Sequence, residues 1–580
     1  MFYDRDWHSE KGKIPPYMPD NPRDEERHAL LWHSLKEGGR PEDIDEVIKA
    51  LSPPPDVTTI APPGCFKGMR VGIIGGGQAG LAAAFELRKL GFDITVFEAL
   101  KRIGGRFYTY YFDEEERYYG ELGAMRFPVS HETTWHYINL FGLNTRPFVQ
   151  NNQNALLYIK GERVRNDPKG RNVVKRIYPR FNLSLNERST LPAELLFCAL
   201  EKPLLKMPER IRPEIVTIRE AYSPEILCLD RYSVRGILHE AGLSEDAISL
   251  LGSLSPFVGS FLYYNYMEIL QETYPYDFVF LYEIVGGAVR LPRAFYRSLM
   301  DESPFEYKGI PKNLLGKVSI KRGAYVDGIF GQRPDGRVTV RYKIGDTGDH
   351  LQEDFDFVVC ALPFSTLRKA KIDPLFSTRK MQAIRELGYA QAQKSLLFCR
   401  FRFWEKGGPE ERIIGGGSYT DLLISQIWYP SDHARLVKAG EYTKWDFRPG
   451  VSPEEPGVLL ASYNFTQDAV RLGNLPEDMA FDTVKRQVEE VHGLPLGYLD
   501  NVAIEFVRVN WDDEPAHLGA FSYYLPEQKR IFSYAVSIPE YKGRVYFAGE
   551  HVSGTHSWAN GAFKTAMQAA LDIAKAAYKI

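Results

Sequence analysis

Three glycines with dinucleotide-binding spacing lie between an expected strand and an expected helix. Gly75, Gly77 and Gly80 form a GxGxxG motif in the run VGIIGGGQAGLAAAFEL. The first glycine of such a motif permits a tight turn, the second lets the backbone approach a pyrophosphate, and the third allows close helix–strand packing. The N-terminus of the following helix, at Gln78 and Ala79, offers free N–H donors and a positive dipole end. The spacing therefore predicts a binding site for the phosphates of a dinucleotide.

An acidic residue follows at the position where a ribose is recognised. Glu98 ends the next expected strand, 18 residues after Gly80, and its carboxylate is placed to accept hydrogen bonds from an adenosine ribose. That acid disfavours a 2′-phosphate and therefore NADP. A second glycine pair between arginines, RIGGR at 102–106, suits a further phosphate or isoalloxazine contact, whereas a nicotinamide-dependent dehydrogenase continues with more βα units. We therefore expect FAD.

A βαβ unit must position these residues. The apolar pattern predicts a strand over 69–74, a helix over 78–90 and a second strand over 93–97. Gly91 stops the helix. This order predicts an α/β fold that begins with a Rossmann-like unit.

The rest of the chain divides by its periodicity. Residues 166–275 have mostly helical spacing, with Leu-rich stretches over 193–205 and 234–254. Alternating strands are expected over 337–342 and 356–362, followed by a β-rich, aromatic region over about 390–535. A short strand over 544–548 then leads through a Gly-rich turn into a terminal helix. Before the βαβ unit, residues 1–66 are rich in proline and charge, with a short helix expected over 24–34.

Composition sets limits on the class of protein. The 580 residues are 44% hydrophobic and 25% charged, which is ample for a large core and several domains. A net charge of −3 gives no electrostatic footprint for nucleic acid. No segment reaches the roughly 18 apolar residues that span a bilayer, and the start MFYDRDWHSEKGK is too polar for a signal peptide. We expect a cytoplasmic protein without membrane partners; a mature secreted chain would have the same features.

Cysteines and histidines give no sign of a metal site. The five cysteines have neither CxxC spacing nor the density of a disulfide framework, and we expect reduced core thiols. His551 and His556 do not repeat a metal-ligand spacing with carboxylates or thiols. We expect no metal.

The run over 71–106 resembles the N-terminus of the flavin amine oxidase superfamily, which contains monoamine oxidases, polyamine oxidases and L-amino-acid oxidases. Four further segments resemble family motifs and occur in family order: GGAVRLPRAF from Gly286, VVCALPFSTLR from Val358, KSLLFCRFRFWE from Lys394 and YFAGEHVSGTHSWANGA from Tyr546. The segment before residue 60 matches only loosely.

The resemblance implies a discontinuous Rossmann-like FAD-binding domain, a mixed-sheet substrate-binding domain and a helical domain. The FAD-binding domain is expected over 68–108, 276–366 and 539–580, the substrate-binding domain over 109–165 and 367–538, and the helical domain over 166–275. Residues 1–67 are expected to pack on the substrate-binding domain as an extension. We also expect a homo-oligomer, in the form of a dimer.

The resemblance also implies FAD contacts in each part of that domain, with Val326 near the adenine and Gly549 and Glu550 near the pyrophosphate and ribityl chain. The terminal helix would direct its N–H groups at the flavin pyrimidine edge. Monoamine oxidases attach FAD to a cysteine near the C-terminus, but the last cysteine here is Cys399, so FAD should be non-covalent. The expected FAD-binding residues are Gly75, Gly77, Gln78, Ala79, Gly80, Glu98, Ala99, Gly105, Arg106, Ala124, Met125, Arg126, Val326, Trp511, Gly549, Glu550, Trp558 and Ala559.

Lys394 is the expected catalytic residue. It lies in an otherwise apolar, strand-like run, QKSLLFCRF, where a buried ammonium needs a partner. In the family, the lysine at this motif position holds a water beside flavin N5 and assists reoxidation by O2 or imine hydrolysis. The alternative is an edge-strand lysine whose ammonium reaches solvent.

Arg126 narrows the substrate. The segment GELGAMRFP resembles the stretch of L-amino-acid oxidases in which an arginine clamps the substrate carboxylate, and amine oxidases lack that arginine. A guanidinium can hold a carboxylate bidentately. The alternative is a structural pair with an acid such as Glu121. The family counterpart of Tyr429 donates to the same carboxylate, with Trp428 leaving the register uncertain by one residue, and Trp558 would wall the substrate cavity.

The expected reaction is oxidative deamination of an L-amino acid to a 2-oxo acid, with release of ammonia and hydrogen peroxide. An amino-acid 2-monooxygenase, which forms an amide by decarboxylation, would share all of these residues. An amine or polyamine oxidase would share the flavin chemistry without needing Arg126. A flavoprotein with structural FAD or a binding scaffold is a third alternative. The preferred amino acid stays open.

Overall fold

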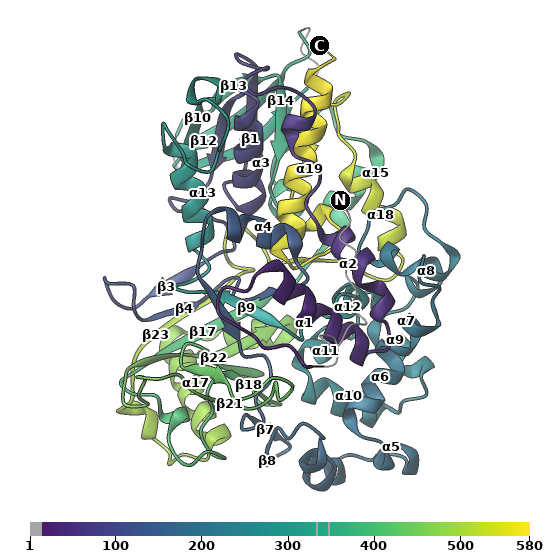
Figure 1. Cartoon of the computed structure of the whole chain (residues 1–580), viewed down its shortest axis with the longest axis vertical. Helices are drawn as coiled ribbons and strands as arrows, with labels where there is room; N and C mark the ends of the chain where they lie inside the picture. Colours follow the sequence, from purple (N-terminus) through teal and green to yellow (C-terminus); the bar gives the residue numbers. More distant parts are fainter. Residues whose placement is uncertain (1–13, 332–334, 346–347, 580) are drawn as a thin grey trace.

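The computed structural model describes residues 14–331, 335–345 and 348–579. Figure 1 shows a parallel-sheet region at the top, a mixed-sheet region at the lower left and a group of short helices at the lower right. The N-terminal helices α1 (Asp24–Glu37) and α2 (Ile44–Leu51) lie where the three regions meet. The structure is therefore mixed α/β, as the sequence predicted.

The upper region is built on a five-stranded parallel sheet in the order β10-β2-β1-β14-β25. The predicted βαβ unit is confirmed, with β1, helix α3 and β2 within a residue or two of the expected bounds. The strands come from all three segments that the sequence assigned to the FAD-binding domain. The elements are β1 (Arg70–Ile74), α3 (Gln78–Lys89), β2 (Asp93–Glu98), α13 (Arg290–Met300), β10 (Val318–Arg322), β14 (Phe357–Cys360), β25 (Val545–Phe547) and α19 (Ala559–Ala577).

A smaller four-stranded sheet, in the order β13-β12-β11-β15, lies beside the parallel sheet. The predicted strands over 337–342 and 356–362 are present, but the second belongs to the parallel sheet as β14. Val326 is buried in β11 and packs in one core cluster with Phe97 of β2. The strands are β11 (Ala324–Phe330), β12 (Val338–Ile344), β13 (Leu351–Phe355) and β15 (Lys371–Asp373), followed by α14 (Phe364–Leu367), α15 (Thr378–Glu386) and, later in the chain, α18 (Gln528–Ser537).

The lower-left region contains a seven-stranded mixed sheet in the order β23-β17-β22-β19-β18-β7-β8. It joins strands from 109–165 with strands from 367–538, and α17 (Glu477–His492) covers one face through a core that includes Val484 and Val488. The strands are β7 (Leu156–Ile159), β8 (Glu162–Arg165), β17 (Ala392–Cys399), β18 (Gly416–Thr420), β19 (Gln426–Tyr429), β22 (Gly457–Phe465) and β23 (Ala503–Asn510), with α16 (Thr466–Gly473) after β22.

Short pairings and one helix link this sheet to the upper region. They are β3 (Thr109–Tyr111) with β4 (Tyr119–Glu121), β5 (Phe127–Pro128) with β9 (Leu281–Ile284) and β6 (Thr145–Phe148), α4 (Glu132–Leu140), β16 (Gly388–Tyr389) with β24 (Ser522–Tyr523), and β20 (Ala434–Leu436) with β21 (Trp445–Phe447).

The helical region over 166–275 consists of short helices rather than long ones. Each predicted Leu-rich stretch contains a break: Pro203 stands near the start of α7, and Gly242, at φ +85°, separates α9 from α10. Ser244 caps α10 by accepting from the Ala247 N–H, which fixes where that helix begins. The helices are α5 (Leu185–Ser189), α6 (Pro192–Leu200), α7 (Lys202–Lys206), α8 (Pro224–Leu229), α9 (Val234–Glu240), α10 (Glu245–Leu254), α11 (Pro256–Ser260) and α12 (Tyr266–Thr273).

The N-terminal extension packs differently from the prediction. Arg27 donates to the Val129 carbonyl at 2.7 Å and pairs with Glu132 at 2.8 Å. Arg40 of the α1–α2 loop donates to the Tyr274 carbonyl at 3.2 Å, at the end of α12. Asn560 of α19 donates to the Leu51 carbonyl at 3.2 Å. The extension therefore lies against all three regions and not only the expected substrate-binding domain. Residues 1–13 are outside the described part.

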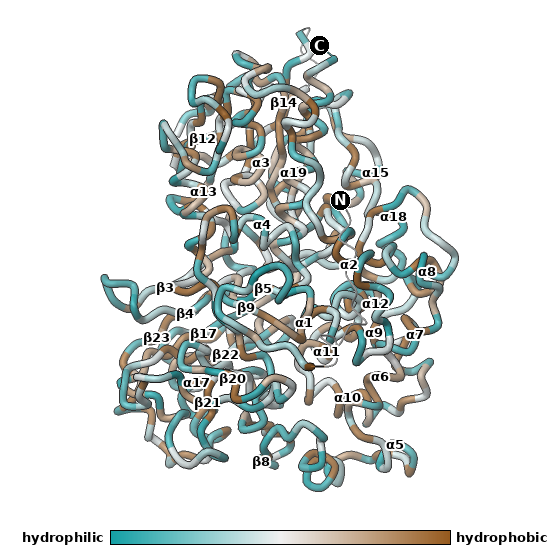
Figure 2. The backbone as a smooth tube through the Cα atoms, in the orientation of Figure 1, coloured by the Kyte–Doolittle hydropathy of each residue, from teal (hydrophilic) through white to brown (hydrophobic). Residues whose placement is uncertain are grey.

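The hydrophobic cores follow these layers. Figure 2 shows apolar residues concentrated along α3, β14 and the sheet strands. Hydrophilic residues lie at outer tips such as the β3–β4 hairpin. Strand β1 is almost wholly buried because it lies at the middle of its sheet with a helical layer beside it. Within the described residues, no helix is long and apolar enough to cross a membrane.

The cysteine prediction was only partly right. Cys360 and Cys399 are buried, and burial raises the pKa of the Cys360 thiol to about 11. Cys65, Cys198 and Cys228 are exposed, because they lie in a turn and in short surface helices rather than in sheet strands.

Candidate active site

A cavity of about 1200 Å³ begins at the carboxyl edge of the parallel sheet and extends to Lys394 and Trp558. Because all five strands are parallel, the turns after β1, β2 and β14 open on the same edge. We refer to this space as the nucleotide cavity. The residues that line it include Gly75, Gly77, Glu98, Gly105, Arg106, Ala124, Ala361, Lys394, Tyr463, Trp511, His517, Glu550 and Trp558.

The GxGxxG turn is shaped for close approach by a ligand. Gly75 has φ +108°, and a Cβ there would lie 2.9 Å from the Ala361 carbonyl oxygen. A Cβ on Gly80 would lie 1.9 Å from the Gly75 oxygen, so only glycine lets α3 pack this tightly on β1. No side chain caps α3 at Gly77, and the first-turn N–H groups of a helix have no partner within the helix. These donors face the cavity.

Glu98 stands at the end of β2, 6% exposed and on the cavity wall. Its two oxygens accept from the Gly76 and Leu100 N–H groups, each at 2.8 Å. Burial raises its pKa, which these backbone hydrogen bonds oppose. Nearby, the side-chain oxygen of the buried Gln78 has no partner among the described residues. Together these acceptors, glycines and helix donors fit the ribose and pyrophosphate of a dinucleotide.

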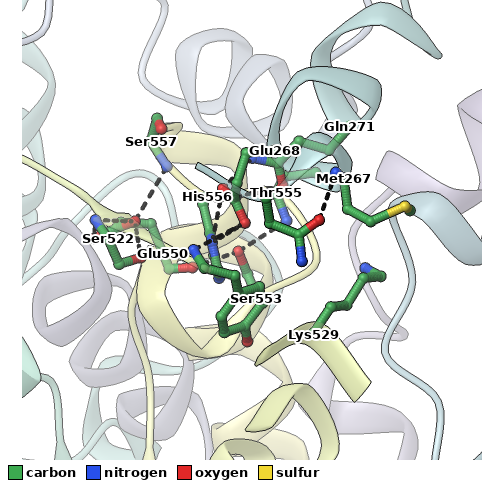
Figure 3. A network of polar contacts seen from close by, with 12 residues as sticks. Met267, Glu268, Gln271, Ser522, Lys529, Glu550, Ser553, Thr555, His556 and Ser557 are labelled. Carbon is green, nitrogen blue, oxygen red and sulfur yellow. Dashed lines mark hydrogen bonds and ion pairs between the residues drawn. The ribbon is translucent and has the colours of Figure 1, made fainter. Parts of the chain in front are cut away.

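Glu550 anchors the C-terminal motif. Arg106 pairs with it at 2.8 Å. The Ser522 hydroxyl and the Ser557 N–H donate to it at 2.7 and 3.1 Å (Figure 3). Burial alone would raise the pKa of Glu550, but Arg106 and His556 lower it to about 2. The carboxylate therefore holds the loop over 549–558 against the segment that carries Arg106.

The N-terminus of α19 points at the opposite end of the cavity. Trp558 precedes the helix without a capping side chain, and Trp558, Ala559 and Ala562 line the cavity. A helix of 19 residues carries a positive partial charge at this end. The position suits an electron-rich ring edge or a developing negative charge.

Lys394 is a buried residue on an interior strand of the seven-stranded mixed sheet. Its strand, β17, lies between β22 and β23, and the residue is 2% exposed. The ammonium donates to the Gly123 and Glu121 carbonyls at 2.7 and 3.2 Å and lies 4.4 Å from the Tyr463 ring centre. Burial lowers its pKa. The alternative of an edge-strand lysine reaching solvent is therefore excluded.

Arg126 lies in an aromatic enclosure. The guanidinium carbon is 4.7 Å from the Trp428 ring centre and 5.0 Å from that of Phe278, and Nη1 donates to Gln150 at 2.9 Å. Among the described residues, no carboxylate forms an ion pair with it. The alternative partner Glu121 is occupied instead by the Thr109 hydroxyl at 2.8 Å and the Ala288 N–H at 2.6 Å.

The uncovered surface of Arg126 faces a second cavity of about 1200 Å³, built largely by the helical region. We call it the substrate cavity. Its wall is mainly aromatic and aliphatic and holds two acids; it includes Leu196, Phe197, Glu201, Phe257, Ile269, Glu272, Phe278, Tyr419, Trp428 and Phe465.

Trp558 stands between the two cavities. Its indole N–H donates to Glu272 at 3.2 Å, and its ring contacts Phe278 and His131 with centroid distances of 5.5 and 5.0 Å. Trp511 lines the nucleotide cavity and donates to the Leu122 carbonyl at 3.0 Å. Both tryptophans therefore line the nucleotide cavity, and Trp558 also contacts Phe278 on the wall of the substrate cavity.

Tyr429 does not reach Arg126, which corrects the sequence-based expectation. Side chains alternate along β19, so Trp428 points at Arg126 while Tyr429 points to the opposite face. The Tyr429 hydroxyl lies 2.8 Å from the Ser418 hydroxyl and 3.0 Å from His492 Nε2. The tyrosines whose phenol groups have the largest electrostatic effect on Arg126 are Tyr463 and Tyr419.

Four more predicted residues lie off the wall of the nucleotide cavity. Gly80 packs inside the βα turn, Val326 is in the core behind β2, and Arg126 faces the other cavity. The sulfur of Met125 lies 3.3 Å from the Lys394 ammonium, where it supports that side chain.

Sequence reasoning missed several wall residues. Ala361, Leu362 and Pro363 follow β14 within the motif VVCALPF, so their position after a parallel strand was the available signal. Tyr463 pairs directly with Lys394 across β22 and β17, which only the register of the sheet reveals. The other missed residues are Gly104, Phe107, Gly123, Ala392, Ala516, His517, Ala520, Phe521, His551, Ser557 and Ala562.

A polar network supports the Trp558 loop from behind. Figure 3 shows His556 between Glu268 and Gln271 of α12. His556 Nδ1 lies 3.1 Å from the Glu268 carboxylate, and the backbone N–H of His556 donates to the Gln271 side-chain oxygen at 3.0 Å. In the described part of the chain, no group of three or more histidines, cysteines and acids is arranged to hold a metal ion.

The family model for flavin-containing amine oxidoreductases matches residues 78–574. The chain belongs to this family. It is 29% identical to an L-amino-acid oxidase of Bothrops atrox over 513 residues, covering 87% of this chain and 89% of the relative. It is also 29% identical to the putative L-amino-acid oxidase YobN of Bacillus subtilis (strain 168), covering 86% of this chain and 94% of the relative.

Two solved structures share the fold. A putrescine oxidase superposes with a TM-score of 0.64 at 16% identity, covering 87% of this chain and 98% of that chain. Cyclohexylamine oxidase from Brevibacterium oxydans IH-35A superposes with a TM-score of 0.60 at 16% identity, covering 88% and 99%. The fold is that of flavin amine oxidases, and the chain is a flavin-dependent oxidoreductase.

We expect Glu98→Ala to weaken FAD binding by about 1 to 3 kcal/mol, since it removes a charged hydrogen-bond acceptor for the ribose. Titration of apoprotein with FAD, followed by quenching of flavin fluorescence, measures the change. Asp93→Asn, at the other end of the same strand, serves as a matched control and should leave the affinity unaltered. Equal affinity in wild type and Glu98→Ala would show that Glu98 does not bind the ribose.

Proposed function

We propose that this protein binds FAD non-covalently and oxidises L-α-amino acids to 2-oxo acids, ammonia and hydrogen peroxide. The observation that carries the proposal is Arg126, a guanidinium inside the protein that faces a cavity and has no acidic partner among the described residues. Burial of an unpaired charge is costly, and burial lowers the pKa of this arginine. A substrate carboxylate would supply the missing counter-charge.

The wall residues would orient such a substrate. Arg126 would hold the carboxylate, and Trp558 and Tyr463 on the wall of the nucleotide cavity would face the reacting end of the substrate. FAD, when bound in the nucleotide cavity, would supply a hydride acceptor. Lys394, on the wall of the same cavity, is placed to hold a water or to polarise O2 through its ammonium group.

Arg126 also favours this reaction over oxidation of simple amines. A putrescine-like substrate has no carboxylate and would leave the guanidinium unpaired. The solved structures that share the fold are amine oxidases by name, whereas the relatives with 29% identity are named L-amino-acid oxidases. A decarboxylating 2-monooxygenase would use the same clamp, and its product would be an amide rather than a 2-oxo acid.

A peroxide-coupled screen of L-amino acids, D-isomers and simple amines tests the proposal. We expect peroxide with one or more L-amino acids and 2-oxo acid as the product. Peroxide with amines alone, or an amide product, would contradict it.

The flavin should be released intact by acid or heat. No cysteine of the described chain lines the nucleotide cavity, so no thiol is available there for attachment. Absorbance of the supernatant after precipitation measures the release, and yellow colour retained by the precipitate would contradict non-covalent binding.

We expect Arg126→Ala to lower kcat/KM for every accepted amino acid by about 30- to 5,000-fold, because truncating one partner of a buried charge pair costs about 2 to 5 kcal/mol. FAD content should be unaffected. Arg126→Lys should restore part of the loss, since a point charge attracts the carboxylate without holding it bidentately.

Steady-state peroxide assays at matched FAD content measure these constants. An Ala variant with wild-type kcat/KM would place the carboxylate clamp elsewhere and remove the main support for an amino-acid substrate.

We expect Lys394→Met to keep FAD but to slow flavin reoxidation about 100-fold. This factor is the low end of the range by which a positioned acid–base side chain accelerates a reaction. Methionine has similar length and removes only the ammonium. Stopped-flow mixing of the reduced enzyme with O2 gives the rate. An unchanged reoxidation rate would remove Lys394 from that step.

A further inference from the structure

Three acids lie close together on α12 and in the turn that follows it, and two of them lie against a histidine. Glu268 accepts from the Tyr524 N–H at 3.2 Å and from Gln271 at 3.1 Å, and it pairs with His556. Asp277 accepts from the Ser130 hydroxyl at 2.7 Å and lies 3.1 Å from His131. Both carboxylates therefore have a structural role.

Glu272, one helical turn after Glu268, is different. It is 4% exposed, and its Oε1 accepts only from the Trp558 indole at 3.2 Å. Its second oxygen, Oε2, is buried without a hydrogen-bond partner among the described residues. No cation of the described chain forms an ion pair with Glu272. Because a buried carboxyl oxygen without a donor is costly, a ligand is the natural source of the missing hydrogen bond.

The position of Glu272 indicates which group of the ligand would donate the missing hydrogen bond. Glu272 and Arg126 both line the substrate cavity, and each influences the ionisation of the other. They form no ion pair, so their charged atoms are more than 4.0 Å apart. The cavity thus presents one unpaired cationic group and one unpaired acidic group across a gap. An α-amino acid carries a carboxylate and an ammonium group on neighbouring carbons, and it is complementary to this arrangement.

We propose that Glu272 binds the ammonium group of the substrate through Oε2 and accepts its proton. This assignment rests on the proposed amino-acid substrate and makes Glu272 a further catalytic residue. In the step, one N–H bond of the ammonium breaks, an O–H bond forms on Glu272, and the nitrogen keeps its electron pair. The neutral amine that results is the form from which a Cα hydride can leave, and no further reactant is needed.

The charges around Glu272 favour proton uptake. Burial raises its pKa well above the ordinary value, and Asp277 and Glu268 add to the rise, while the Trp558 indole and Arg126 oppose it. Tyr463 also faces this group. A carboxylate with a raised pKa is a stronger base than an exposed one, so it is better matched to an ammonium donor.

Glu272→Gln keeps an oxygen that can accept from Trp558 and removes only the base. At pH 7 we expect kcat/KM for an accepted amino acid to fall about 100-fold or more. The loss should shrink as the pH rises, by about tenfold per unit below the pKa of the substrate amine, because the neutral amine then arrives from solution. A purely structural role would give a loss that does not depend on pH.

Binding provides a second measurement. An aliphatic carboxylate without an amine, 4-methylpentanoate, should bind wild-type and Glu272→Gln holoenzyme with Kd values that agree within about threefold, since it uses only Arg126. Titration calorimetry measures this. A large loss of carboxylate affinity in the variant would overturn the proposal.

Glu201→Gln is the comparison variant. Glu201 lies on the wall of the same cavity, but its carboxylate already accepts from the Tyr276 hydroxyl at 2.8 Å. It should show no pH-dependent rescue. Equal kcat/KM for wild type and Glu272→Gln across the pH range would refute the proposed role of Glu272 but not the proposed function. A wild type that oxidises no L-amino acid would refute the proposed function itself.

Discussion

The common edge of the five-stranded parallel sheet is the constraint on which the rest of the structure depends. Parallel strands place all their carboxyl ends together, so β1, β2 and β14 deliver Gly75, Glu98 and Ala361 to one cavity although Ala361 is far from the other two in the sequence. Three separate segments of the chain contribute strands to this sheet, and the insertions between them form the other regions.

Buried charge is distributed around that edge in two ways. Where a charge holds the fold, its partner is present: Arg106 pairs with Glu550, and Arg27 pairs with Glu132. Where a charge faces the substrate cavity, the described chain provides no opposite charge in contact with it, as for Arg126 and Glu272. Since unpaired buried charges destabilise a fold, their presence at facing positions is best explained by a ligand that completes both.

The helical region decides the shape of the space beyond these two residues. Its helices are short because Pro203, Gly242 and similar breaks interrupt the apolar stretches, and the resulting turns bring Phe197 and Phe257 to the wall of the substrate cavity. Such a wall follows from the packing of several helices. The nucleotide cavity is built instead around the sheet edge, so the two cavities depend largely on different parts of the chain.

The sequence by itself determined the βαβ unit, the fold class and the family, because glycine spacing, strand-end acids and apolar periodicity are local signals. It also directed attention to Arg126 and Lys394. Only the tertiary structure decided that Trp428 rather than Tyr429 faces Arg126, since a strand that shifts by one residue exchanges its two faces. Likewise, Tyr463 beside Lys394 and the unpaired oxygen of Glu272 depend on sheet register and helix packing across distant segments, which no local pattern encodes.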